Sequence, residues 1–187
     1  MNASGAVHSG GAADGGGTVA TDALGATDTR MSERTRVTAC VAVGANLGDA
    51  LEAVRQAVID LGRLPCTQVE LTSSLYRSAP YEAQGPDFIN AIVRIATSLS
   101  APDLLVALQA LESAAGRERP YLNAPRTLDL DLIFYGQACM DSPALTLPHP
   151  RWQERAFVLL PLAEVAPDRV TPAMLAAVAG QAIERVA

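Results

Sequence analysis

The chain has 187 residues with hydrophobic side chains at 49% of positions, which suits one domain with a substantial core. No apolar run approaches the roughly 20 residues that a membrane-spanning helix needs, so we expect a cytoplasmic protein that binds no membrane. The formal net charge of −6 at pH 7 argues against broad nucleic-acid binding but leaves room for a local cationic pocket.

The first part of the chain differs in composition from the remainder. Half of the 14 glycines fall within the first 25 positions, among mostly Ala, Thr, Ser and Asp. Such a segment cannot bury enough apolar area to offset the entropy of ordering. We therefore predict that residues 1–34 form a disordered extension and that residues 35–187 form the folded domain.

The domain is expected to open with a buried strand over residues 38–44. Asp49 then caps a helix that carries apolar residues at helical spacing and ends at Gly62. A second strand is predicted over residues 68–77. After a loop with two prolines, a third strand over residues 88–97 is the expected hairpin partner of the second.

The second half repeats the pattern. A helix is expected over residues 101–115, then a polar loop, a strand over residues 128–135 and a short extended piece over 145–148. Two closing helices are predicted over residues 151–165 and 172–186. The order β-α-β-β-α-β is typical of an α+β fold, the ferredoxin-like split βαβ sandwich, here with C-terminal helical additions.

The strand over residues 128–135 carries the strongest chemical signal. Because side chains alternate along a strand, Asp129 and Asp131 point away from the leucines between them. Two carboxylates on one face of an apolar strand repel each other unless a cation lies between them. Mg²⁺ favours such oxygen ligands together with substrate phosphates, and Arg126 offers a planar fork to a phosphate. The alternative is an edge strand with two solvated aspartates.

The loop before this strand is rich in arginine. All 14 basic residues are arginines, so lysine-dependent phosphate sites and Schiff bases are excluded. Arg117 and Arg119 follow a hinge at Gly116 and could close over a polyphosphate. The alternative is a loop whose arginines pair with local acids such as Glu112.

Two further patterns suggest binding sites. His149 lies between two prolines, where a rigid imidazole could donate to a phosphate, although a structural role is the alternative. Phe88 and Asn90 share one face of the third strand, which suits stacking on a flat heterocycle and hydrogen bonding to its edge. The alternative places Phe88 in the core and Asn90 at a strand end.

Taken together, the segments form an ordered set that resembles the 6-hydroxymethyl-7,8-dihydropterin pyrophosphokinase family of folate biosynthesis. The resemblance covers residues 37–168 and rests on the motifs GANLGD, SSLYRSAP, GPDFINAIV, LESAAGRERP, NAPRTLDLDLIFYG and LPHPRWQERAFVLLPLAEVAP. It implies that ATP donates its β,γ-pyrophosphoryl group to the hydroxymethyl oxygen of the pterin, with release of AMP.

The resemblance also implies roles for individual residues. Two Mg²⁺ ions would be held by Asp129 and Asp131, and Arg117 and Arg119 would act on transition-state charge from a mobile loop. The positions that match ATP contacts are Gln109, Glu112, Arg126, Leu132, Thr146, His149 and Arg155. The positions that match pterin contacts are Gly44, Ser78, Pro80, Tyr81, Phe88, Asn90 and Phe157. We expect a monomer.

The chain departs from the family pattern in the arginine loop. Asn123 and Ala124 stand where the family often has Trp-Gly, so an aromatic contribution to loop closure is missing. Two other functions remain open: a homologue that binds pterin without catalysis, and a ferredoxin-like interaction or RNA-binding module. The intact aspartates and arginines argue against the first, and the acidic composition argues against the second.

Overall fold

The computed structural model describes residues 35–80, 85–116 and 126–186. The predicted disordered extension lies outside these ranges. None of the helices within them is both long and apolar enough to cross a membrane.

The fold is built on one antiparallel sheet. Its strands are β1 (Val37–Ala45), β2 (Thr67–Thr72), β3 (Tyr76–Ser78), β4 (Phe88–Thr97), β5 (Asp129–Tyr135) and β8 (Ile183–Arg185). The strand order is β5-β1-β4-β3-β8, and β2 pairs with β4 next to β3. A small hairpin of β6 (Met140–Asp141) and β7 (Thr146–Leu147) forms a separate sheet.

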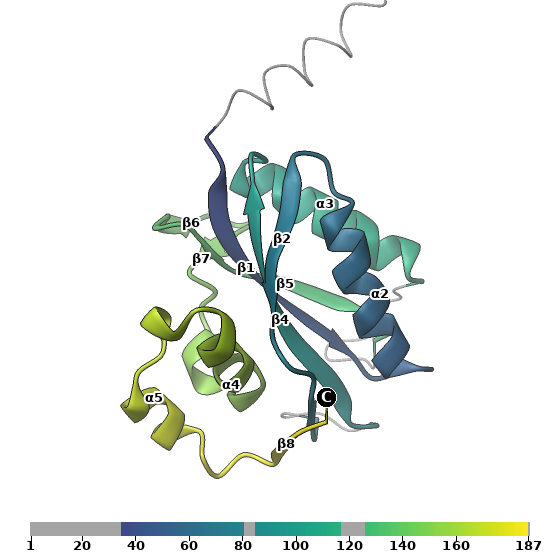
Figure 1. The fold of residues 1–187 in the computed structure, drawn as a ribbon, viewed down its shortest axis with the longest axis vertical. Coiled ribbons are helices and arrows are strands. Elements are labelled where there is room, and N and C mark those ends of the chain that lie inside the picture. Colours follow the sequence, from purple (N-terminus) through teal and green to yellow (C-terminus); the bar gives the residue numbers. More distant parts are fainter. Residues whose placement is uncertain (1–34, 81–84, 117–125, 187) are drawn as a thin grey trace, which may run out of the picture.

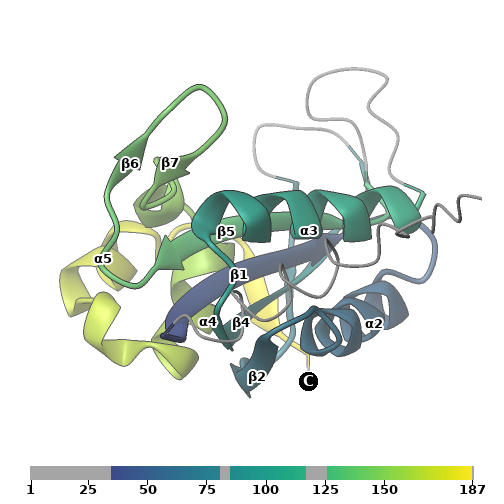
Figure 2. The ribbon, with the colours of Figure 1, turned by 90° about the horizontal axis from the view of Figure 1, so that it is seen from above.

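Helices cover both faces of the sheet (Figures 1 and 2). α2 (Ala50–Gly62) and α3 (Ala101–Ala114) pack on one face. α4 (Ala156–Val165) and α5 (Pro172–Ala177) lie against the other, together with the short 3₁₀ helices η1 (Trp152–Glu154) and η2 (Pro167–Arg169). The expected α+β, ferredoxin-like arrangement is confirmed, with α4 and α5 as the C-terminal additions.

Side chains alternate between the two faces of the sheet along each strand, and each face has its own apolar core. On β4, Ile89, Ala91 and Val93 join the core under α2 and α3, whereas Ile92 joins the core under α4. On β5, Leu130 and Leu132 join the α2 and α3 side. A strand buried on both faces reads as a nearly continuous apolar run, as β4 does.

The second strand predicted over residues 68–77 is in fact two strands, separated by Ser73–Leu75. Side chains hold this break in place. The Ser73 hydroxyl accepts a hydrogen bond from the Ile92 N–H at 2.9 Å, and Glu164 of α4 accepts one from the Ser74 N–H at 2.7 Å. The sequence pattern alone did not predict that hydrogen bonds to these side chains would replace regular strand pairing in the segment between β2 and β3.

The predictions for the C-terminal helices were partly wrong. The helix expected over residues 151–165 is interrupted at Arg155, which has extended backbone angles of φ −120° and ψ 115°. The helix expected over residues 172–186 ends at Ala177, and the chain then forms β8 on the open edge of β3. Gly180 disfavours the longer helix by roughly 1 kcal/mol relative to alanine, and Ile183 packs against the α4 core instead.

Candidate functional site

A row of paired residues crosses the sheet on the α4 side. Asp129 of β5 lies opposite Gly44 of β1, which lies opposite Asn90 of β4, which in turn lies opposite Tyr76 of β3. Asp131 lies one step along, opposite Ala42. The prediction that the two aspartates point away from the leucines of their strand is confirmed by the burial of Leu130 and Leu132 on the other side.

The two aspartates lie near basic side chains. Burial raises the pKa of Asp131, and the nearby charge of Asp129 raises it further, while His149, Arg155 and Arg126 act in the opposite direction. The Arg126 guanidinium donates directly to the Asp129 carboxylate. Such a mutually repelling carboxylate pair, only partly balanced by arginines, fits an additional cation.

His149 is held beside β5 by its backbone. Its N–H donates to the carbonyl of Ile133 at 3.0 Å, and its Nδ1 accepts a hydrogen bond from the Arg151 N–H at 3.2 Å. Burial lowers the pKa of His149, and the charge of Asp131 opposes this shift. A neutral imidazole that accepts at Nδ1 carries its proton on Nε2, so that nitrogen is the donor available to a ligand.

Arg155 has an unmet hydrogen-bonding group. Its Nε is buried and has no hydrogen-bond partner among the residues that the structure describes, and burial lowers the pKa of the guanidinium against the favourable charges of Asp131 and Asp129. Buried donors are nearly always satisfied. An anionic oxygen beside the aspartates, such as a phosphate oxygen, would satisfy this one.

A second group of predicted residues gathers around Asn90. Its side chain is 5% exposed, and its Nδ2 donates to the Ser78 hydroxyl at 3.0 Å. A Cβ placed on Gly44 would lie 3.3 Å from Asn90 Oδ1 and 3.9 Å from Cδ1 of Phe88. The absence of a side chain at Gly44 therefore leaves the Asn90 carboxamide and the Phe88 ring uncrowded.

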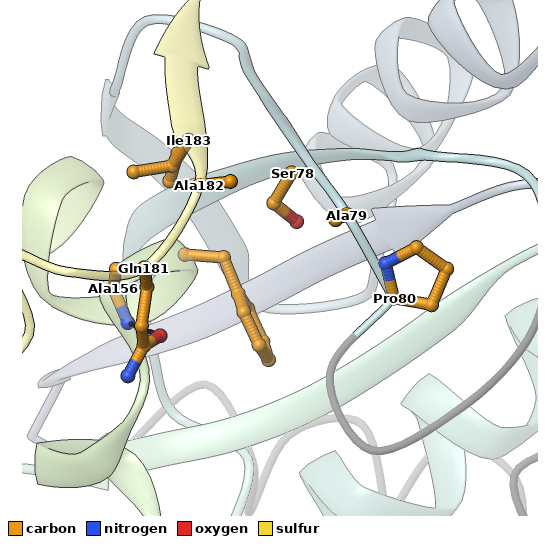
Figure 3. A pocket seen from close by; sticks show the side chains of 8 residues that line it. Ser78, Ala79, Pro80, Ala156, Gln181, Ala182 and Ile183 are labelled. Carbon is orange, nitrogen blue, oxygen red and sulfur yellow. Dashed lines mark hydrogen bonds between the residues drawn. The ribbon is translucent and has the colours of Figure 1, made fainter.

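A pocket of about 120 Å³ opens next to this group (Figure 3). It is lined by Ser78, Ala79, Pro80, Ala156, Phe157, Gln181, Ala182 and Ile183. Three of these, Ser78, Pro80 and Phe157, are among the residues predicted to bind pterin. Cζ of Arg155 lies 5.5 Å from the centre of the Phe157 ring, which connects the pocket to the cationic side of the site.

The remaining residues predicted to contact ATP lie at the β5 edge and beyond it. Glu112 of α3 is 3% exposed and accepts a hydrogen bond from the Leu130 N–H at 2.7 Å, which fastens α3 to β5. Gln109 is exposed on the same helix, and Thr146 lies on β7. The Leu132 side chain belongs to the α2 and α3 core, so only its backbone could contact a ligand on the opposite face.

Three predicted residues, Arg117, Arg119 and Tyr81, lie outside the described residues, as do Asn123 and Ala124. Within the described ranges, no cluster of three or more His, Cys, Asp or Glu side chains forms a metal-binding group. The two aspartates would therefore rely on substrate phosphates and water to complete the coordination of Mg²⁺, which is usual for this ion.

The sequence analysis did not single out Asn46. This 4% exposed residue donates from its backbone N–H to the Arg126 carbonyl at 3.0 Å and accepts from the Arg126 N–H at 2.7 Å. Its Nδ2 also donates to the Pro86 carbonyl at 3.2 Å. An asparagine between a buried strand and a helix cap was the only signal, and many turns share it.

Comparisons with known proteins identify the family of the chain. The family model described as 7,8-dihydro-6-hydroxymethylpterin-pyrophosphokinase (HPPK) matches residues 40–167. The chain is 47% identical over 134 residues to 2-amino-4-hydroxy-6-hydroxymethyldihydropteridine pyrophosphokinase of Synechocystis sp., covering 72% of this chain and 69% of that protein. It is 43% identical over 153 residues to the protein of the same name from Pseudomonas aeruginosa, covering 78% of this chain and 94% of that protein.

A solved structure supports the fold. The crystal structure of Plasmodium falciparum HPPK-DHPS wild type with SDX-DHP superimposes with a TM-score of 0.54 at 14% identity, covering 71% of this chain and 41% of that one. Identity this low speaks for the fold alone. The family match and the two bacterial relatives go further, and they show that the chain belongs to the 7,8-dihydro-6-hydroxymethylpterin-pyrophosphokinase family.

Proposed function

We propose that this chain transfers the β,γ-pyrophosphoryl group of ATP to the hydroxymethyl oxygen of 6-hydroxymethyl-7,8-dihydropterin, with release of AMP, as a step of folate biosynthesis. The observation that supports this best is the shared sheet face. Along it lie two aspartates, the Nε of Arg155, which has no hydrogen-bond partner among the described residues, and the largely apolar pocket beside Ser78 and Phe157. These are the parts that a polyphosphate donor and a flat acceptor require.

The aspartate pair is the proposed metal site. Asp129 and Asp131 would hold two Mg²⁺ ions, which supply charge neutralisation between the attacking and leaving oxygens of an in-line displacement. Arg126, now paired with Asp129, would turn its guanidinium to the phosphates when a cation takes its place. His149, through Nε2, and Arg155, through Nε, are the further residues proposed to donate hydrogen bonds to the phosphates.

The pterin is proposed to lie over β1 and β4. Asn90 would read the amide-like edge of the ring system, and Phe88 and Phe157 would stack on its two faces. Ser78, Pro80, Tyr81 and Gly44 would complete this subsite. Gln109, Glu112, Leu132 and Thr146 are proposed to surround the adenosine.

The chemistry needs little from an acid or base. The hydroxymethyl oxygen attacks the β-phosphorus, the bond from that phosphorus to the α,β-bridging oxygen breaks, and AMP leaves. In a loose phosphoryl transition state the alcohol proton departs late, to a nearby water or an aspartate carboxylate, so positioning and charge stabilisation dominate. Arg117 and Arg119 are proposed to stabilise the developing charge, where arginines can contribute on the order of 10³–10⁵ in rate.

The test is nucleotide analysis with ATP and Mg²⁺, with and without 6-hydroxymethyl-7,8-dihydropterin. AMP that forms only with the pterin, without ADP, is the expected result. ADP would place the attack at the γ-phosphorus and contradict the proposed reaction. Binding of pterin without any nucleotide turnover would favour a non-catalytic homologue and direct attention to Asn123 and Ala124.

A further inference from the structure

The C-terminal segment forms one wall of the pocket. Gln181, Ala182 and Ile183 face Ser78, Ala79 and Pro80 across it (Figure 3). The family match ends at residue 167, so this wall comes from beyond the matched region.

The Gln181 carboxamide makes two hydrogen bonds to the backbone at the start of α4. Its Oε1 accepts from the Ala156 N–H at 2.9 Å, and its Nε2 donates to the Glu154 carbonyl at 2.7 Å. These groups belong to the peptide units on either side of Arg155. α4 has no capping hydrogen bond from the side chain of its own N-cap residue, Arg155, and Gln181 supplies an acceptor from outside.

This contact determines how two functional side chains are presented. Because Gln181 bonds to the peptide on each side of Arg155, it fixes Arg155 in its extended conformation. In that conformation the guanidinium interacts electrostatically with Asp131. It also fixes the first turn of α4, from which Phe157 faces the pocket. Arg155 serves the proposed phosphate subsite and Phe157 the proposed pterin subsite.

Gln181 is itself anchored to the pterin side of the sheet. Two residues later, Ile183 of β8 pairs with Ser78 of β3, and the Val186 N–H donates to the Leu75 carbonyl at 2.8 Å. The Gln181 N–H donates to the Val178 carbonyl at 3.0 Å. The carboxamide therefore links the strand that carries Ser78 to the turn that carries Arg155 and Phe157.

We propose that Gln181 is a positioning residue for both substrates, and that residues 181–183 are part of the pterin pocket. This inference rests on the proposed function. Gln181 acts through Arg155 and Phe157, so its loss weakens both substrate subsites at once.

The experiment compares Gln181→Ala and Gln181→Glu with Gln153→Ala, a control at an exposed glutamine on η1. Losing two backbone hydrogen bonds should raise the KM of both ATP and pterin by about five- to tenfold and also lower kcat. Gln181→Glu keeps an acceptor for Ala156 but not the donor to Glu154, so intermediate values are expected. The Gln153→Ala constants should equal those of the wild type.

A readout without substrate separates positioning from stability. Amide hydrogen exchange at Ala156 should accelerate in Gln181→Ala and stay unchanged in Gln153→Ala. Faster exchange with unchanged kinetic constants, measured well below the unfolding temperature, would reduce Gln181 to a structural role and overturn the proposal.

The failure of the proposed function would look different. If the wild type releases no AMP, binding of ATP and of 6-hydroxymethylpterin is measured by calorimetry in the same variants. Weaker binding of both ligands in Gln181→Ala would support the positioning role, and unchanged binding of both would overturn it.

Discussion

At the scale of single residues, the site depends on charges that the sheet holds in an unfavourable arrangement. Asp131 is half-buried, and its pKa is raised by burial and by Asp129. The arginines and His149 offset part of this cost. Carboxyl groups whose pKa is shifted by burial and by a neighbouring like charge are enriched at functional sites.

Replacing Asp131 with asparagine should therefore separate activity from stability. We expect kcat to fall by about 10²-fold or more, because charge neutralisation at the phosphates is lost, while pterin affinity changes little. The temperature of unfolding should not fall, because the substitution removes a repelling carboxylate. Asp141→Asn, at an exposed position of β6, is the control in a coupled assay and a thermal melt. Unchanged turnover in Asp131→Asn would contradict the metal role.

Gly44→Ala tests the close approach of β1 to the proposed pterin subsite. The new Cβ would lie 3.3 Å from Asn90 Oδ1, so the carboxamide must shift by a few tenths of an ångström. We expect weaker pterin binding with nearly unchanged ATP binding, both measured by calorimetry. Equal weakening of both ligands would point instead to a general disturbance of the sheet.

The residue scale also shows where sequence reasoning stops. The face shared by Asp129 and Asp131 could be predicted because strand alternation is a local rule. The hydrogen bonds of the Gln181 side chain could not be predicted. They join residues 25 and 27 positions apart and depend on how the C-terminal segment packs against the start of α4. Asn46 was missed for the same reason, with a partner 80 residues away.

At the scale of elements, one contact couples the break between β2 and β3 to α4. Glu164 accepts hydrogen bonds from the Tyr76 hydroxyl at 2.5 Å and from the Ser74 N–H at 2.7 Å. Burial raises the pKa of Tyr76 to about 12, and the bond to Glu164 contributes in the same direction. Desolvation opposes ionisation of Glu164, but the bonds from Ser74 and Tyr76 outweigh it and hold its pKa below the usual value.

This contact predicts a pH-dependent contribution to stability. A carboxyl whose pKa is lowered in the folded state stabilises that state above its unfolded pKa and loses the effect as pH falls through the folded pKa. Wild type should therefore be more stable than Glu164→Gln at pH 7, and the gap should close on acidification below the ordinary range of glutamate. Denaturant unfolding at several pH values measures it. A gap that persists in acid would contradict the coupling.

The elements also explain the errors in the predicted secondary structure. The long amphipathic helices α2 and α3 and the apolar strand β4 were predictable because their patterns are repeated over many residues. The three-residue strands β3 and β8 have no such pattern. β8 exists because β3 offers an unpaired edge, and that edge is a property of the tertiary structure rather than of the tail.

At the scale of the whole molecule, the two faces of the sheet have different roles. The face under α2 and α3 is closed by an apolar core, and the α4 face carries the proposed site at its open end. The α+β fold class could be predicted from element order alone, because few topologies satisfy that order. Element order alone could not identify the reaction, because many functions share this fold; the motifs that resemble the pyrophosphokinase family predicted it, and the family match agrees.

The division of the chain into residues 1–34 and the folded domain stays a prediction. A chain that starts at Met31 should unfold at the same temperature as the full chain and retain its kcat, because the removed segment has the composition of a disordered region. Thermal melts and the AMP assay on both chains measure this. A loss of activity after truncation would assign the extension a role in catalysis.

The course of β8 has a practical consequence for anyone who produces the protein. The Val186 N–H donates a hydrogen bond to the Leu75 carbonyl. Ile183, three residues before Val186, lines the pocket. An affinity tag or fusion partner attached after residue 187 would pull directly on the strand that borders the pocket. A tag placed ahead of β1 enters the described fold near Val37, which pairs with Thr97 at the opposite end of β4 from Asn90, so kinetic work and inhibitor screening should use amino-terminal fusions.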